Sequence, residues 1–407
     1  MTDLVEGRMD LIKQTRVAKI ALAVAISVMS IMVYTSAAHA QKFTTLYAFT
    51  GGTDGGNPSA GVIRDKKSNL YGTTFWGGSA GEGVVFKLDA TGHETVMYNF
   101  TGGSDGSNPA AALFRNPKGG LYGTTLSGGA NGEGTVFKVD SAGETVLYSF
   151  SGTDGRQPYY NVIQDAKGTF YGTTLFGGID KWGAIFSLDK SGKETVLYSF
   201  TGQADGANPG PLKMDAAGNL YGTTASGGQG CNGNGCGTVF KVDTNGTLTI
   251  VHTFGGTDGA MPWGGVILDA KGNLYGSTEI GGAYGNGTVF KVDTSGMETV
   301  LYSFTGGADG QWPLAPLTRD AKGNLYGTTY AGGDLSGCQN NAPGCGTVFK
   351  IHPNGKETTL HTFIGGSEGG NSQSALIWDG KGNVYGTTHG VAGGGAAGYG
   401  TVWKLKL

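Results

Sequence analysis

One acidic motif recurs along this chain of 407 residues at intervals of about 50 residues. In each copy an acid is followed by glycine, and in six of the seven copies a proline lies four positions after the acid. The seven acids are Asp54, Asp105, Asp154, Asp205, Asp258, Asp309 and Glu368. Such a set could form a ring of carboxylates that binds a cation or a polyol. The alternative is a turn in which each acid accepts backbone N–H groups and the glycine completes the bend, and recurrence in every unit favours the turn.

Several aromatic side chains stand where the repeated sequence varies, which makes them candidates for binding. Flat rings at the mouth of a channel can stack on the apolar C–H faces of sugar rings. The alternative is that they only cover the ends of neighbouring strands. We expect equivalent positions in other units to hold Gly, Ala or Ser, so that replacing these rings leaves folding nearly intact. The candidates are Trp76, Tyr159, Tyr160, Phe176, Trp263, Trp312 and Tyr330, with Trp76, Tyr159, Trp263 and Trp312 as the leading contacts.

No combination of residues predicts catalysis. Three matches to Gly-x-Ser-x-Gly lack the strand-to-helix turn and the histidine partner that this motif needs. The histidines lack the spacing of metal ligands. An enzyme would have to use charged residues that occur in single units, and the candidates are Arg156, Asp180, Lys181, Glu279 and His389. We therefore predict no catalytic residue, no metal and no cofactor.

The four cysteines form two close pairs, Cys231 with Cys236 and Cys338 with Cys345. In an exported protein such pairs predict two local disulfides, each fixing a glycine-rich loop. The alternative is a zinc site made of all four cysteines. That site would have to join loops of the fourth and sixth repeats, and no histidine accompanies either pair.

Residues 1–40 differ from the rest of the sequence. Three basic residues precede a 15-residue apolar run from Ile20 to Tyr34, and small residues then lead to Ala40. This order is typical of a secretory signal, and the apolar run is shorter than the roughly 20 residues that span a bilayer. No Arg-Arg pair is present, so we expect Sec-type export, cleavage after Ala40, and a secreted or periplasmic location.

After residue 40 the amino-acid composition stays uniform, so we expect residues 41–407 to be a single domain and a monomer. Glycine accounts for 79 residues, which separate short runs of Val, Thr, Tyr, Phe and Leu. This composition is typical of many short strands joined by turns. The formal net charge is −3, so nothing indicates nucleic-acid binding, and no second apolar segment predicts a membrane span in the mature chain.

The dipeptide Tyr-Gly recurs at one equivalent position in each of seven units. Its tyrosines are Tyr71, Tyr122, Tyr171, Tyr221, Tyr275, Tyr326 and Tyr385, with spacings of 51, 49, 50, 54, 51 and 59 residues. Each unit contains four strand-like runs, a to d, which in the second unit cover 111–115, 121–125, 135–140 and 144–150. Several runs are apolar on both faces, as in sheets packed between two neighbours. The period and the four runs predict an all-β, seven-bladed β-propeller with four-stranded blades.

The order of the runs at the two ends predicts how the ring closes. The mature chain begins with a d run, 44–49, and ends with a c run, 401–405. A ring whose last blade takes its outer strand from the N-terminus has this order, because no blade is then left incomplete. A linear β-solenoid is the alternative fold, but it would normally show shorter coils and distinct capping units.

The unit resembles the GloVer-type tandem repeat of exported bacterial proteins, whose hallmark is Asn-x-x-Gly-x-Thr, a Gly-Gly loop and Gly-Thr-Val-Phe. In the fourth unit these are residues 219–224, 227–228 and 237–240, and all seven units carry the pattern. Val84 and Ala184 replace the threonine of Gly-Thr-Val-Phe in two units. The resemblance implies a propeller outside the cytoplasm and brings no established activity and no known catalytic residues. A weaker similarity to kelch repeats rests on repeat length and the Gly-Gly doublet.

Two functions from different classes follow. The first is a non-catalytic binding or surface-interaction module that recognises a glycan or a cell-surface protein. The second is a polysaccharide-active hydrolase or lyase, since acids at a channel mouth can act as a pair. The d-to-a and b-to-c connections are long and emerge on one face, so we expect the contacts there. The scarcity of unit-specific acids favours binding.

We predict that the mature protein begins at Gln41. A host that exports the full chain should release a protein without residues 1–40, because signal peptidase cleaves after a small residue such as Ala40. Intact-mass spectrometry of the exported protein checks this result. Ala40→Phe should block the cleavage, and an exported wild type that keeps residues 1–40 would contradict the assignment.

Overall fold

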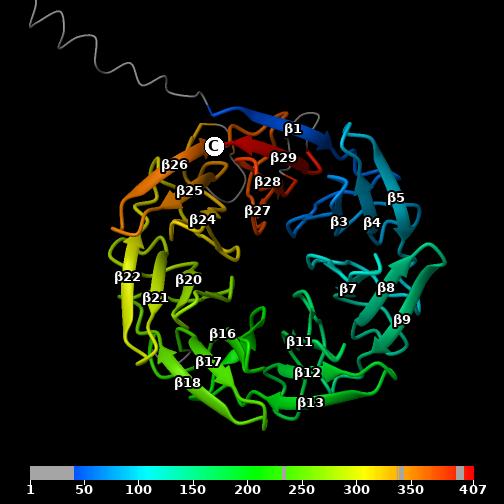
Figure 1. Cartoon of the computed structure of the whole chain (residues 1–407), viewed down its shortest axis with the longest axis horizontal. Coiled ribbons are helices and arrows are strands. Elements are labelled where there is room, and N and C mark those ends of the chain that lie inside the picture. The colour runs from blue at the N-terminus through cyan, green and yellow to red at the C-terminus, as the bar shows by residue number, and fades with distance from the viewer. Residues whose placement is uncertain (1–40, 232–234, 337, 339–342, 391–397) are drawn as a thin grey trace, which may run out of the picture. The chain divides into compact units, whose positions relative to one another are not determined.

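The computed structural model describes residues 41–231, 235–336, 338, 343–390 and 398–407, and these residues form strands and turns without an α-helix. Within that part of the chain no helix is long and apolar enough to cross a membrane. Seven small antiparallel sheets form a ring around a central opening (Figure 1). The structure is therefore the predicted all-β, seven-bladed β-propeller.

The strands of each blade follow one another from the ring axis outward in the order a, b, c, d (Figure 1). Blade 1 contains β2 (Ile63–Arg64), β3 (Leu70–Thr74), β4 (Val84–Leu88) and β5 (Glu94–Asn99). Blade 2 contains β6 (Phe114–Arg115), β7 (Leu121–Thr125), β8 (Thr135–Asp140) and β9 (Gly143–Ser149). Blade 3 contains β10 (Ile163–Gln164), β11 (Phe170–Thr174), β12 (Ala184–Leu188) and β13 (Glu194–Ser199).

Blade 4 has a divided inner strand. It contains β14 (Ala207–Pro209), β15 (Lys213–Met214), β16 (Leu220–Ser226), β17 (Thr238–Val242) and β18 (Leu248–Thr253). Blade 5 contains β19 (Val266–Leu268), β20 (Leu274–Thr278), β21 (Thr288–Val292) and β22 (Glu298–Ser303). Blade 6 contains β23 (Thr318–Arg319), β24 (Leu325–Thr328), β25 (Thr347–Ile351) and β26 (Glu357–Thr362).

Blade 7 closes the ring with strands from both ends of the propeller. It contains β27 (Ile377–Trp378), β28 (Asn383–Thr388), β29 (Thr401–Lys406) and, as its outer strand, β1 (Phe43–Ala48). β1 pairs antiparallel with β29, with Phe43 opposite Leu405 and Ala48 opposite Thr401 (Figure 1). The closure predicted from the order of the runs is confirmed.

The inner strand is shorter than predicted. In blade 2 the expected run 111–115 contributes only β6 to the ladder. The carbonyl of Ala111 accepts a hydrogen bond from Thr73 Oγ1 of blade 1 at 3.0 Å, and Thr124 Oγ1 of blade 2 likewise donates to the Tyr160 carbonyl of blade 3 at 3.1 Å. These inner segments are bound to the preceding blade, which fixes where their side chains meet the channel.

A pair of aromatic rings joins each blade to the next. The ring that follows strand d packs at a steep angle on the ring in strand c of the next blade, as Phe100 does on Phe137 with centroids 5.0 Å apart. The pairs are Phe49–Phe86, Phe100–Phe137, Phe150–Phe186, Phe200–Phe240, Phe254–Phe290, Phe304–Phe349 and Phe363–Trp403. All are fully buried. Because an aromatic side chain buries 150–250 Å², these pairs dominate the contact between blades.

The glycine of Tyr-Gly makes room for the ring in strand c. In blade 4 Gly222 lies directly opposite Phe240 in the ladder between β16 and β17. A Cβ atom added to Gly222 would stand 2.6 Å from Phe240 Cζ, far inside the usual carbon–carbon separation. The equivalent distance is 2.5–2.7 Å in all seven blades. The repeated dipeptide is therefore a steric requirement of the interblade packing.

The acids of the repeated motif are held within their own loops. Asp54 accepts hydrogen bonds from Tyr47 Oη at 3.0 Å and from the Thr50 N–H at 2.9 Å. A tyrosine or histidine of strand d makes the equivalent contact in all seven loops, as His252 Nε2 does with Asp258 Oδ2 at 2.9 Å. The turn interpretation accounts for these contacts.

A second carboxyl lies near the loop acid at several blade interfaces. At or next to the start of strand d, blades 1, 2, 3 and 5 have Glu94, Glu144, Glu194 and Glu298. Burial and, to a smaller extent, the acid of the preceding loop raise the pKa of each to about 7, although His252 partly opposes this at Glu298. One carboxyl oxygen of each is buried and has no hydrogen-bond partner among the described residues. The folded ring therefore favours the protonated form of these side chains.

We predict that Gly222→Ala lowers the free energy of unfolding by about 1–3 kcal/mol, the usual effect of forcing an extra carbon into a packed core. Thermal unfolding of the variant and the wild type measures the loss. Gly307→Ala is the matched control, since a Cβ at this loop position meets its nearest atom at 3.4 Å. Equal melting temperatures for the two variants would refute the steric role of the strand-b glycine.

We predict that the propeller becomes more stable as the pH falls from 8 to about 5. A carboxyl whose pKa is raised on folding contributes stability that is complete below its ordinary pKa of 4.5 and is lost as the pH rises through about 7. With four such groups the melting temperature should rise by roughly 5 °C over this interval. Circular dichroism measures the shift. Replacing all four glutamates by glutamine should flatten the profile, and an unchanged profile would show that other groups cause it.

Candidate functional site

A cavity of about 440 Å³ lies on the ring axis, where the inner segments of all seven blades converge. The first residue after the repeated proline lines it in blades 1, 2, 3, 5 and 6, and Gln373 occupies the same position in blade 7. These residues are Ser59, Ala110, Tyr159, Trp263, Leu314 and Gln373. Small residues at this position in blades 1, 2 and 4 leave space into which the rings of blades 3 and 5 project.

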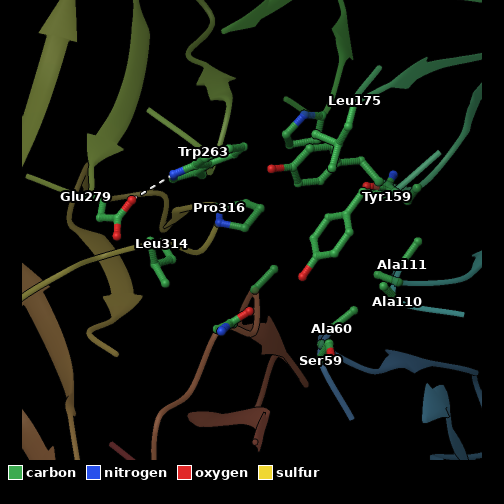
Figure 2. A pocket seen from close by; sticks show the side chains of 17 residues that line it. Ser59, Ala60, Ala110, Ala111, Tyr159, Leu175, Trp263, Glu279, Leu314 and Pro316 are labelled. Atoms are coloured by element: carbon green, nitrogen blue, oxygen red, sulfur yellow. Dashed lines mark hydrogen bonds between the residues drawn. The ribbon is translucent and has the colours of Figure 1, made fainter. Parts of the chain in front are cut away.

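Tyr159 projects into the cavity from blade 3 and Trp263 from blade 5 (Figure 2). Both rings are half-buried, and Tyr160 lines the same cavity. Burial raises the pKa of Tyr159 and, more strongly, that of Tyr160. Both phenols are therefore neutral at physiological pH and can donate a hydrogen bond.

The segments that carry these rings are fixed by the neighbouring blades. Thr124 Oγ1 donates to the carbonyl of Tyr160, and Thr223 Oγ1 donates to the carbonyl of Pro262 at 2.5 Å. Trp263 follows this proline directly, so its backbone is bound to blade 4. The rings project from a rigid frame, which reduces the entropy lost when a ligand binds.

Glu279 provides a carboxylate beside the Trp263 ring (Figure 2). Trp263 Nε1 donates to Glu279 Oε2 at 2.8 Å. Burial raises the pKa of Glu279, while the hydrogen bond from Trp263 lowers it. The contact orients both side chains and leaves the other carboxylate oxygen without a hydrogen bond among the described residues.

The structure separates the seven aromatic candidates into two groups. Tyr159, Tyr160 and Trp263 line the cavity, whereas the other four do not belong to its wall. Trp312 lies beside Tyr330 with ring centroids 6.4 Å apart. Phe176 lies 5.4 Å from the Arg156 guanidinium, and Trp76 is 49% exposed in a b-to-c loop.

The expectation that equivalent positions hold Gly, Ala or Ser is wrong for Trp312, and for Trp263 it fails in blades 6 and 7, which hold Leu314 and Gln373. Its equivalents are Asn57, Asn108, Gln157, Asn208, Met261 and Asn371, and all seven residues have φ between 54° and 59°. Asparagine tolerates this left-handed conformation better than most residues. The Asn108 amide also donates to the Phe75 carbonyl at 3.1 Å. Trp312 therefore replaces a structural asparagine, which residue patterns alone do not reveal.

The charged residues that are specific to single units do not gather in one place. Glu279 alone among them lines the cavity that the described residues form. Asp180 and Lys181 are exposed in a b-to-c loop of blade 3, and Arg156 lies in the preceding d-to-a loop. His389 is half-buried in blade 7, where burial lowers its pKa. Glu279 can be recognised in the sequence as the one acid directly after strand b.

One group of side chains could offer metal ligands. His252, Asp258 and Glu298 place donor atoms within 4.8 Å of one another at the interface of blades 4 and 5. The histidine stands where five other blades have the tyrosine that binds the loop acid. His361 and Glu368 repeat the histidine–acid contact at 3.0 Å without a third ligand in the described residues. Hydrogen bonding therefore accounts for both histidines.

The two predicted disulfides are present, Cys231–Cys236 and Cys338–Cys345, with Cα separations of 5.5 and 5.0 Å. Each packs against the following d-to-a loop, since a Cβ on Gly256 would lie 3.2 Å from Cys231 Sγ and one on Gly370 would lie 3.1 Å from Cys338 Sγ. Disulfides persist in oxidising compartments, which favours a location outside the cytoplasm.

Fold and cavity together define a seven-bladed propeller with a chamber of small-ligand size on its axis. The sequence profile of the Gloeobacter/Verrucomicrobia repeat matches residues 29–235 and 212–407. The chain belongs to this family, so the resemblance seen in the sequence is confirmed. No curated protein matches the chain.

Several solved structures are similar in fold. One is an extracellular domain from B. thetaiotaomicron, described as part of a hybrid two-component system, with 13% identity and a TM-score of 0.56 over 90% of this chain and 41% of that one. Another is PorZ, described as a surface component of the type-IX secretion system of Porphyromonas gingivalis, with 16% identity and a TM-score of 0.50 over 85% of this chain and 46% of that one. This chain spans less than half the length of either relative, and such low identity shows the fold alone.

Proposed function

We propose that this protein is an exported, non-catalytic propeller that binds a glycan in the cavity on the ring axis. The observation that carries the proposal is that the rings of Tyr159 and Trp263, from blades 3 and 5, both project into that cavity (Figure 2). A sugar ring has apolar C–H faces and polar edges. Aromatic walls with a few polar groups between them match this pattern.

The size and the polar groups of the cavity support a glycan over a protein partner. Its volume of about 440 Å³ lies in the range of small-molecule sites, whereas a stable protein interface needs roughly 800 Å² on each partner. Ser59, Asn161 and Gln373 line the same cavity and can exchange hydrogen bonds with hydroxyl groups.

Binding without catalysis is the better account of the acids. Most glycoside hydrolases use two carboxyl groups on either side of the scissile bond. Glu279 is the single carboxylate among the described residues that line the cavity. A polysaccharide hydrolase would need a second acid that this wall does not provide.

The location outside the cytoplasm forms part of the same proposal. Residues 1–40, the expected signal peptide, lie outside the described residues, and the mature domain would comprise residues 41–407 as a monomer. The two disulfides support a secreted or periplasmic destination after Sec-type export. Partners would then be extracellular glycans.

We predict that Trp263→Ala weakens glycan binding about tenfold, because stacking contributes about 0.5–1.5 kcal/mol beyond the area buried. A glycan array probed with the exported mature protein identifies the ligand, and calorimetry compares the variants. The melting temperature should change little, since the equivalent position holds small residues in blades 1, 2 and 4.

Trp312→Asn is the matched control, because it removes a tryptophan outside the cavity and restores the residue found in four equivalent positions. Its affinity should equal that of the wild type. A folded Trp263→Ala variant with undiminished affinity would place the site elsewhere, and an unfolded one would make Trp263 a core residue.

A further inference from the structure

Glu279 breaks the repeat at a position that otherwise carries no acid. It is the first residue after strand b, where the other six blades have Phe75, Leu126, Leu175, Ala225, Tyr330 and His389. The scaffold therefore does not require a carboxylate here. Among the described residues its side chain has one hydrogen bond, from the Trp263 indole, and none to another blade.

The electrostatic character of the cavity follows from this residue. Among the residues that line it, Glu279 is the one acid and none is Lys, Arg or His. The remaining lining is alanine, proline, leucine, aromatic rings and a few neutral polar groups, which screen a charge weakly. An anionic sugar would place its charge near Glu279 without a compensating cation, so such ligands are disfavoured. A cationic group would offset the free-energy cost of burying the charged carboxylate.

The geometry leaves one carboxylate oxygen of Glu279 available to a cation. Glu279 Oε2 already accepts the Trp263 N–H at 2.8 Å, so the carboxylate is held beside the indole while its second oxygen is available. An ammonium group next to this pair can donate a charge-assisted hydrogen bond to the second carboxylate oxygen. The sugar ring that carries the ammonium group would then contact Tyr159 in the same cavity (Figure 2).

We infer that the cavity selects a sugar with a free, protonated primary amine, such as a 2-amino-2-deoxyhexose, whose ammonium group binds Glu279 while its C–H face packs on Trp263 or Tyr159. This inference rests on the proposed glycan function and names its substrate class. N-acetylation of the same sugar removes the charge and adds bulk, so the free amine is the distinguishing feature.

Calorimetry of the exported mature protein with two β-1,4-linked tetramers tests the inference, one of glucosamine and one of N-acetylglucosamine, at pH 6 and fixed salt. The wild type should bind the glucosamine tetramer about tenfold to a hundredfold more tightly, the usual effect of a hydrogen bond to a charged group. Glu279→Gln keeps an acceptor for the Trp263 N–H and should remove this preference.

Asp180→Asn is the matched control for non-specific attraction between a polycation and an acidic protein. It removes the same charge from an exposed b-to-c loop outside the cavity. The preference for the free amine should survive in this variant. Equal losses in Asp180→Asn and Glu279→Gln would mean that overall charge causes the preference, which overturns the inference.

Other outcomes separate the inference from the proposed function. If neutral glycans bind in a manner that depends on Trp263 and the two tetramers bind equally, the glycan site stands and the amine selectivity is wrong. If putrescine binds as tightly as the glucosamine tetramer, the cavity recognises a cation rather than a sugar, and both proposals fail. If no glycan on the array binds, the proposed function itself fails.

Discussion

Every blade interface depends on the same contact, an aromatic ring after strand d packed on a ring in strand c of the next blade. The second ring occupies the space that a side chain on strand b would fill, so strand b has glycine there, as at Gly222 against Phe240. Three positions in two blades are thus coupled. A change at one of them requires compensation at the others, which keeps the sequence repeat regular. Blade 7 satisfies the same constraint with Trp403 above Gly386.

This coupling explains which parts of the fold the sequence predicts. Strands b and c of blade 2 coincide with the predicted runs 121–125 and 135–140, because these runs carry the coupled residues. The inner run 111–115 was predicted too long. Its residues have strand-like composition, but the Ala111 carbonyl bonds to Thr73 of another blade, and no local pattern reports a partner in the neighbouring unit.

The candidate site could be predicted only in part for a similar reason. Variation within a repeat shows where the scaffold tolerates large side chains, and two residues chosen in this way, Tyr159 and Trp263, line the cavity. It does not distinguish such residues from Trp312, whose backbone conformation is determined by the turn before the proline. Neither does it show that Glu279, distant in sequence from Tyr159, lines the same chamber. The aromatic rings that make the cavity asymmetric come from blades 3 and 5, whereas all seven blades hold its wall in place.

The pairing of β1 with β29 also has a consequence for how the protein reaches its native state. Because the chain is synthesised from its N-terminus, β1 is made first and its partner β29 last. The seam between them therefore forms only after the other six blades are available. Closure therefore brings together the most distant segments of the domain, and its entropic barrier slows the final step of folding. Once the seam is formed, the ring has no terminal blade that can detach alone. The stability of this one strand pair therefore bears on how long the ring stays closed.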